Sequence, residues 1–216
     1  MRTAGDKHRP IDLARRIWKN PIMSRNERTP STLLDVVSSV IATAELPALG
    51  PEVRPNVKSP SQLQREFDLL FSKTKGTQPA KDLIRAAALL WHDHLDAAHS
   101  IVQDAPSAEA AFIHGIMHRR ESDYSNAKYW FDRVGRHATF PKIAARVEQF
   151  LSDQQSRSSS TLVRDGMWQP MNFIEACEEA AEQPDKNSDT VLLQHLQQIE
   201  FETLLEHLCV IAVVAD

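Results

Sequence analysis

Cysteine, glycine and long apolar runs are all scarce in this chain of 216 residues, and each scarcity argues against a class of protein. The two cysteines, Cys177 and Cys209, lie far apart, in no spacing typical of a disulfide framework or a zinc cluster, and both fit apolar helical patterns as core residues. The six glycines form neither a phosphate-binding loop nor the elbow that carries a nucleophilic serine. No apolar run approaches the roughly 18 residues of a membrane span. These absences favour a reduced, cytoplasmic protein that does not span a membrane.

The charge of the chain is not strongly biased to either sign. Charged residues make up 25% of the sequence, and the formal net charge is -4. Such a balance gives no bulk attraction to nucleic acid or to anionic membranes, so neither is expected as a partner. Apolar residues make up 42%, which is enough for a substantial core in one domain of ordinary size.

Helical periodicity is what the sequence has in abundance, and it becomes pronounced near residue 31. Apolar residues recur at helical spacing over residues 31–44, and a shorter amphipathic stretch at 11–19 lies in a basic N-terminal lead. The segment 46–60 carries four prolines and one glycine and is expected to be an extended linker. Residues 1–59 are therefore predicted to be a lead with one or two helices and a proline-rich linker.

Residues 60–216 are predicted to form a single all-α domain. Ser59 and Pro60 are typical of an N-cap and a first helical residue, Ser107 is a second N-cap, and Gly135 is a C-terminal stop. The Ala- and Leu-rich segment 79–105 fits either one long helix or two helices that meet near residues 92–95. No segment alternates apolar and polar residues for long, and no hairpin turn of the Asn-Gly type is identified.

The segment 111–141 resembles a tetratricopeptide repeat, which is a pair of antiparallel helices. Gly115 stands where that family places a small residue so that two helices can approach closely. The dipeptide "DY" follows at the usual turn, and "AKYWF" matches the signature of the second helix. The preceding unit, over residues 86–102, fits the same pattern with a shortened turn. The resemblance implies a helical bundle of repeat-like antiparallel hairpins.

Two histidines replace large packing residues of this repeat pattern. His114 and His118, together with Ala111, occupy those positions in the first helix. The longer phrase "HGIMHRRESDYSNAKYWFDRVG" is also similar to a group of uncharacterised microbial helical proteins. This second resemblance implies a compact helical domain and no particular activity.

Histidines gather in the middle third of the chain, which holds six of the nine. On one helix, His114, His118 and Glu121 stand at i, i+4 and i+7, so they share a face. His92 and His99 repeat the seven-residue spacing if the preceding helix is unbroken. Two facing helices with histidines and a carboxylate are one way in which helical bundles build a centre for zinc, iron or manganese. The ligands of such a centre would be His99, His114, His118 and Glu121.

A structural role for these histidines is the preferred prediction, and neither a metal nor another cofactor is favoured. Gly115 follows His114 at the position where the metalloprotease motif has its glutamate, and the Glu-x-x-His spacing of diiron bundles is missing. Histidines at half-buried helix contacts commonly bond to a carboxylate or a carbonyl. A transition metal is the alternative.

Basic and aromatic side chains follow the two histidines closely. Arg119 or Arg120, with Lys128 and Arg133, could clamp a carboxylate or a phosphate, although a solvated helix surface is the simpler interpretation. Trp130 lies among these basic residues in the sequence. Interleaved aromatic and basic residues suit single-stranded nucleic acid, but the negative net charge argues against that partner.

The predicted function is that of a helical binding module with a polar face lined by histidine and arginine. A peptide, a partner helix or a small anionic ligand would bind to this face. The alternative is an enzyme, with or without a metal, that uses a histidine as general base in a pocket lined by His92, His99, His114, His118 and Glu121. The catalytic candidates are His114, His118 and Glu121. The ligand-binding candidates are His92, His99, His114, His118, Arg119, Glu121, Lys128 and Trp130.

Overall fold

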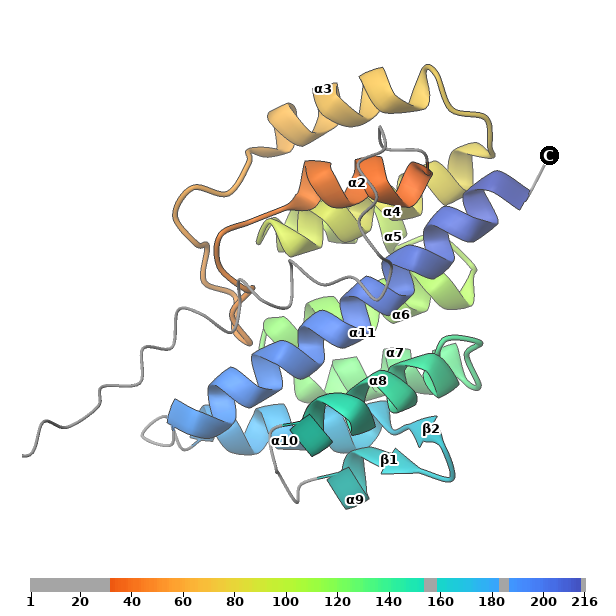
Figure 1. Ribbon diagram of the computed structural model, residues 1–216. Helices are drawn as coiled ribbons and strands as arrows, with labels where there is room; N and C mark the ends of the chain where they lie inside the picture. Colours follow the sequence, from red (N-terminus) through yellow and green to blue (C-terminus); the bar gives the residue numbers. More distant parts are fainter. Residues whose placement is uncertain (1–31, 154–158, 183–186, 215–216) are drawn as a thin grey trace, which may run out of the picture. The chain divides into compact units, whose positions relative to one another are not determined.

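Figure 1 shows the computed structural model, which describes residues 32–153, 159–182 and 187–214. Within those ranges, regular structure consists of helices and one two-stranded hairpin, so the predicted all-α class is confirmed. The expected short helix near residues 11–19 lies outside the described residues. No helix in the described ranges is both long enough and apolar enough to cross a membrane.

Helix α2 (Leu33–Ile41) and the proline-rich segment lie in the same compact unit as the residues from 60 onward, since that unit starts at Leu33. Helix α2 buries Val37 and Ile41 and packs against the last helix. The segment between α2 and residue 60 is extended but anchored, because the side chain of Arg54 is buried and bonds to Asp93. This anchoring, which local sequence patterns do not show, makes the linker part of the domain.

Helix α3 (Pro60–Phe71) begins with the capping arrangement that the sequence predicts. Ser59 Oγ accepts a hydrogen bond from Gln62 N–H, and Gln62 Oε1 accepts one from Ser59 N–H. This reciprocal pair satisfies two backbone donors that a helix start leaves free. Helix α3 packs against helix α4 (Gln78–Trp91) through Leu63, Phe67 and Phe71.

Two helical hairpins follow, formed by α4 with α5 (Leu95–Val102) and by α6 (Ala108–Arg120) with α7 (Tyr124–Val134). The Ala-rich segment is therefore two helices, broken where Asp93 adopts a φ of 67°. Ser122, with a φ of 61°, breaks the second hairpin in the same way. In both turns the next residue donates its N–H to a carbonyl five residues earlier, from His94 to Leu89 and from Asp123 to His118. This is the Schellman motif, built here on residues other than glycine.

Gly115 lets α6 and α7 approach closely. A Cβ atom at this position would lie 2.6 Å from a ring carbon of Phe131. The expectation that a small residue is needed at this point of the hairpin is therefore confirmed.

A short β-hairpin follows helix α8 (Phe140–Asp153) and helix α9 (Ser159–Leu162). Its strands are β1 (Val163–Arg164) and β2 (Met167–Trp168), paired antiparallel. Asp165 and Gly166 form the turn with φ values of 52° and 68°, as a two-residue Asp-Gly turn requires. The expectation that the chain has no such turn is therefore wrong.

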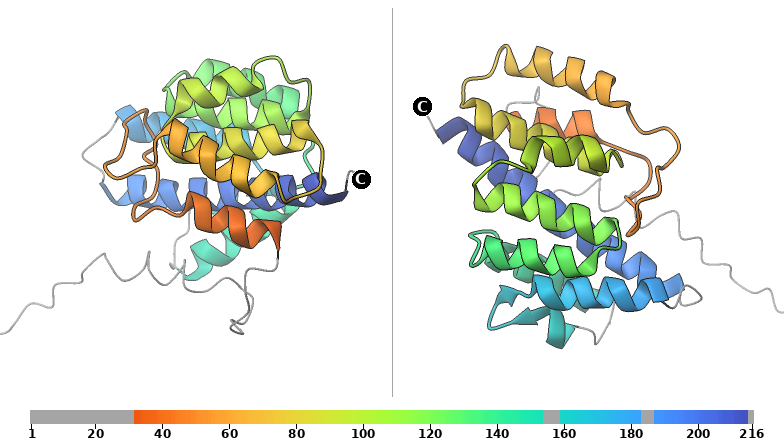
Figure 2. Two further views of the ribbon diagram at one scale, coloured as in Figure 1. Left: turned by 90° about the horizontal axis from the view of Figure 1, so that it is seen from above. Right: turned by 180° about the vertical axis from the view of Figure 1, so that it is seen from behind.

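Helix α10 (Pro170–Glu182) and helix α11 (Asn187–Val214) complete the fold. Helices α3, α4, α5, α6, α7 and α10 follow one another in a row, and α11 crosses this row (Figure 2). Helix α11 packs against α2, α4, α8 and α10. In the middle of the row, every residue from Ala110 to Arg120 of α6 is buried. The histidines of α6 therefore lie inside the domain.

Candidate functional site

Three imidazoles from two helices meet in a cluster, as the sequence spacing predicts. His114 and His118 lie one turn apart on α6, and His99 comes from the facing helix α5. Each ring offers a nitrogen, and the three nitrogens all lie within 4.8 Å of one another. The ring of His99 lies edge-on to that of His114 at 4.7 Å, while His114 and His118 are stacked at 5.1 Å.

His114 is the member of this three-histidine cluster with the least access to solvent, at 2% exposure. Neither of its ring nitrogens has a hydrogen-bond partner among the described residues. The ring instead stacks on Trp130, with centroids 3.8 Å apart and planes 10° apart. Burial, followed by the charges of His99 and His118, lowers the pKa of His114 to about 4. A neutral imidazole without partners in an interior is costly, because its donor and its acceptor both lose water.

His118 is oriented by polar neighbours on two elements. Its Nδ1 lies 2.9 Å from Glu121 Oε2, and Asn126 Nδ2 of α7 lies 3.2 Å from its Nε2. If Nδ1 donates its proton to Glu121, Nε2 accepts the side-chain N–H of Asn126, and an ion bound at Nε2 would replace that bond. A carboxylate that orients a histidine in this way is the usual second partner of a metal-ligating imidazole.

The cluster is open to solvent on one side. His99 is half-buried and the side chain of Glu121 is 33% exposed, whereas His114 and His118 face the interior. Nitrogen ligands of a tetrahedral zinc ion lie about 3.3 Å apart, so small side-chain rotations would bring these three nitrogens to bonding positions. A fourth position would then face the exposed side.

His92 and Lys128, which were expected on the same face, lie elsewhere. His92 is buried at the end of α4, where its Nδ1 accepts a hydrogen bond from Lys58 N–H at 3.2 Å. Lys128 pairs with Glu175 and Glu178 of α10, at 3.3 and 3.7 Å. The structure thus brings together His99, His114, His118, Glu121 and Trp130.

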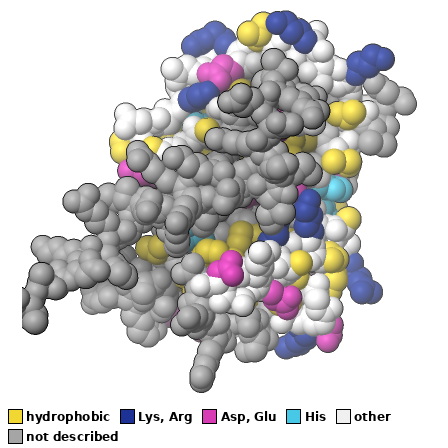
Figure 3. Space-filling model, viewed as in Figure 1, with side chains coloured by type: hydrophobic (Ala, Val, Ile, Leu, Met, Phe, Trp, Pro, Cys, Tyr) yellow, Lys and Arg dark blue, Asp and Glu magenta, His cyan; other side chains and the backbone are white. Residues whose placement is uncertain are grey.

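Arg119 and Arg120 point into the core and not toward a ligand-binding surface. Arg120 bonds to Asp93 at 2.8 Å, and Arg119 bonds to Glu200 at 2.6 Å. The side chain of Arg120 is 1% exposed and that of Arg119 is 0% exposed. The prediction that these two arginines clamp an anion or line a binding face is therefore wrong, because internal carboxylates already neutralise both guanidinium groups. On the face shown in Figure 3, the visible basic and acidic side chains are interspersed.

A second group of titratable residues was missed by the sequence analysis. Glu109 at the start of α6, His137 between α7 and α8, and His207 of α11 also place three ligand atoms within 4.8 Å of one another. The imidazole of His137 has the largest effect on the carboxyl of Glu109, and with a backbone hydrogen bond and His207 it holds the pKa of Glu109 well below its ordinary value. Glu109 and His207 are separated by 98 positions, so no local pattern could have joined them.

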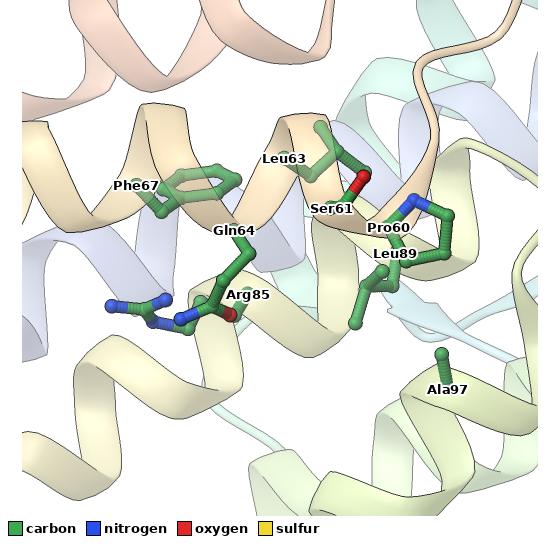
Figure 4. Close-up of a pocket in the computed structure, with 8 residues that line it drawn as sticks. All are labelled: Pro60, Ser61, Leu63, Gln64, Phe67, Arg85, Leu89 and Ala97. Atoms are coloured by element: carbon green, nitrogen blue, oxygen red, sulfur yellow. The ribbon is translucent and has the colours of Figure 1, made fainter.

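An apolar hollow of about 330 Å³ lies between α3, α4 and α5 (Figure 4). Phe67 and Arg85 line one end of it, and Pro60 and Ala97 line the other. The histidines expected to line a pocket are not among its lining residues. Arg85 is held there by an ion pair with Asp68 at 2.7 Å and by the ring of Phe71.

The two cysteines are core residues, as the sequence predicts. Both thiols are free and buried, and burial raises the pKa of each to about 12. A thiol with such a pKa is almost fully protonated at neutral pH and is a poor nucleophile.

Comparison with models of known protein families found no match, and comparisons with curated proteins and with solved structures found none either. Function must therefore be inferred from the side chains themselves. Two groups in the described ranges have the composition and spacing of metal ligands.

Proposed function

We propose that the protein binds one divalent transition-metal ion of the zinc class through His99, His114 and His118. The observation that carries this proposal is His114, a buried imidazole without a hydrogen-bond partner among the described residues, set within a cluster of three rings. A bound ion would accept a lone pair from this ring and so compensate for its lost hydration. A purely structural histidine would instead be expected to bond to a carbonyl or a carboxylate.

The surroundings of the three-histidine cluster support the same proposal. A site with three imidazole ligands suits zinc, cobalt, nickel or copper better than magnesium or calcium, which prefer oxygen. Trp130 fixes the plane of the His114 ring, and Glu121 fixes the orientation of His118. Such outer partners reduce the freedom that the ligands lose when the ion binds.

The proposed role of the ion is to hold a small anionic ligand or a water molecule at its fourth position. Among the partners expected from the sequence, a carboxylate or a similar small anion fits this role better than a peptide, because only one side of the cluster reaches solvent. Three histidines with an open position also occur in catalytic zinc sites. We favour binding over catalysis, because the hollow between α3, α4 and α5, which could hold a larger molecule, is lined by none of the three histidines.

The test is the metal content of the purified protein. After dialysis against metal-free buffer, elemental analysis should find bound transition metal, and a His114→Ala variant should hold about one ion per chain fewer than the wild type. A His195→Ala variant is the matched control, because His195 is also a buried histidine but contacts Phe150 and is not in the cluster. A wild-type protein that is metal-free and takes up no Zn²⁺ on titration would reject the proposal, as would equal loss in both variants.

A further inference from the structure

We propose a second divalent-metal site, formed by Glu109, His137 and His207 and separate in its ligands from the three-histidine cluster. These residues come from α6, from the connection between α7 and α8, and from α11. Two histidines and one carboxylate form a ligand set that leaves other positions of a metal open to exogenous ligands.

The distances within this group are close to those of a metal site. Glu109 Oε1 lies 3.1 Å from His207 Nε2 and 3.7 Å from His137 Nε2. Neighbouring ligand atoms around a first-row ion lie about 3 Å apart. The carboxylate oxygen already stands between the two imidazoles, so little movement is needed to bring all three atoms around one ion.

Hydrogen bonding explains only part of the arrangement. Glu109 and His207 form a hydrogen bond, but His137 Nε2 has no partner within bonding distance in the described part of the chain. The side chain of His137 is only 3% exposed, so water does not readily satisfy this nitrogen. Its other nitrogen, Nδ1, lies 2.8 Å from the hydroxyl of Thr139 and accepts the backbone N–H of the same residue at 3.3 Å.

The position of the His137 ring is set by its neighbours. Phe112 lies edge-on to it at 5.3 Å, and Phe140 lies at 5.9 Å. Because Nδ1 accepts the backbone N–H of Thr139, the neutral ring carries its proton on Nε2 and points it toward Glu109 Oε1, which at 3.7 Å is too far for a good hydrogen bond. A divalent cation that replaces this proton would bond to both atoms at once, since metal ligation requires the deprotonated nitrogen.

The two proposed sites differ in donor chemistry, which allows them to be measured separately. The second site offers one carboxylate oxygen and two nitrogens, a mixture that suits Mn²⁺ and Fe²⁺ as well as Zn²⁺. The three-histidine cluster offers nitrogen only. Mn²⁺ is therefore a selective probe for the second site.

The experiment uses a His114→Ala background, in which the three-histidine cluster has lost a ligand. Titration with Mn²⁺, followed by electron paramagnetic resonance of the free ion, should show one binding site per chain. Adding Glu109→Gln should weaken this binding at least about tenfold, since a neutral amide is a poor replacement for a carboxylate ligand. Glu206→Gln is the matched control, because Glu206 precedes His207 on α11 but pairs with Lys142 and Arg146.

Absence of Mn²⁺ binding in the His114→Ala background would reject the second site, and so would equal affinity with and without Glu109→Gln. A His207→Asn variant, checked for helix content by circular dichroism, gives an independent test if Glu109→Gln does not fold. The two proposals can fail separately. Retention of one zinc ion that depends on His114 but not on Glu109 would leave only the first site standing, and the reverse dependence would leave only the second.

Discussion

The buried carboxylate of Asp93 and the buried imidazole of His114 lie at opposite extremes of hydrogen-bond satisfaction. Asp93 Oδ2 accepts from the backbone N–H of Arg54 at 3.0 Å and from its Nε at 2.8 Å, while Oδ1 accepts from Arg120 at 2.8 Å. The remaining nitrogens of Arg54 reach the carbonyls of Glu45 and Trp91. His114 is equally buried but has no such partner in the described ranges.

This difference separates a group that stabilises the fold from one that we propose to be a metal ligand. A buried charge that accepts from several donors is costly to remove, because the remaining buried charges are then left without a partner. An imidazole that is buried without partners contributes little to the folded state unless something binds to it. Four predictions test this comparison, and they are ordered from the largest expected effect to the smallest.

Replacement of Asp93 by asparagine should cost the most stability. The variant keeps a residue that tolerates a positive φ but removes the charge that faces Arg54 and Arg120, so the free energy of unfolding should fall by about 3–5 kcal/mol. Urea denaturation at pH 7 measures it. Ser122→Asn is the matched control, because Ser122 has the equivalent backbone position in the second hairpin. Equal effects in the two variants would contradict a role for the Asp93 charge.

The stability of the protein should also depend on the protonation of His92. Burial, followed by the charge of Arg54, lowers the pKa of His92 from 6.5 to about 4. The unfolded chain binds this proton at a higher pH than the folded chain does. The free energy of unfolding should therefore fall as pH is lowered from about 6.5 to about 4, by at most about 3 kcal/mol from this group.

Urea titrations at several pH values, on the wild type and on a His92→Gln variant, measure this contribution. Below pH 6.5 the variant should lose stability less steeply than the wild type, because it has no His92 to take up a proton on unfolding. Identical slopes in the two proteins would contradict the prediction.

Replacement of His114 by leucine should have little effect on the metal-free protein. An apolar side chain of similar size removes an imidazole without partners among the described residues, so the free energy of unfolding in EDTA should change by about 1 kcal/mol or less. With Zn²⁺ at a hundredfold excess over the dissociation constant of the three-histidine cluster, the wild type should gain about 2.7 kcal/mol more than the variant. Thermal melts with and without Zn²⁺ measure both effects. A large loss in EDTA would instead mean that His114 has a structural role.

Replacement of Lys128 by alanine should have the smallest effect. Its ammonium pairs with exposed carboxylates of α10, and exposed pairs of this kind contribute about 0–1 kcal/mol. Both metal affinities should be unchanged, because the side chain belongs to neither cluster. Calorimetric titration with Zn²⁺ checks this, and a tenfold change in affinity would show that Lys128 contributes to metal binding.

The sequence predicts the local features of this protein well. The caps at Ser59 and Ser107 and the stop at Gly135 are set by neighbouring residues, and so is the pairing of His114 with His118 on one helix face. The approach of His99 could be predicted as well, because consecutive helices joined by a short turn usually pack against each other. These features depend on spacing within a helix or between sequence neighbours.

The burial of Arg119 could not be predicted in the same way. Periodicity identifies an inner and an outer face only when a helix has both, and α6 is buried on all sides from Ala110 onward. Its partner Glu200 lies 81 positions along the chain. The Asp165-Gly166 turn did carry a local signal, but its strands of two residues each are too short to show alternation.

The burial of α6 from Ala110 to Arg120 also has a kinetic consequence. Backbone amides in such a helix exchange with solvent mainly when the whole domain opens, so hydrogen exchange should be slowest there. An ion held by His114 and His118 could not be released by local fraying of this helix. Its exit would begin instead with rotation of the half-buried His99 on the shorter helix α5. Transfer of the ion to a chelator should then be much faster than the opening of α6.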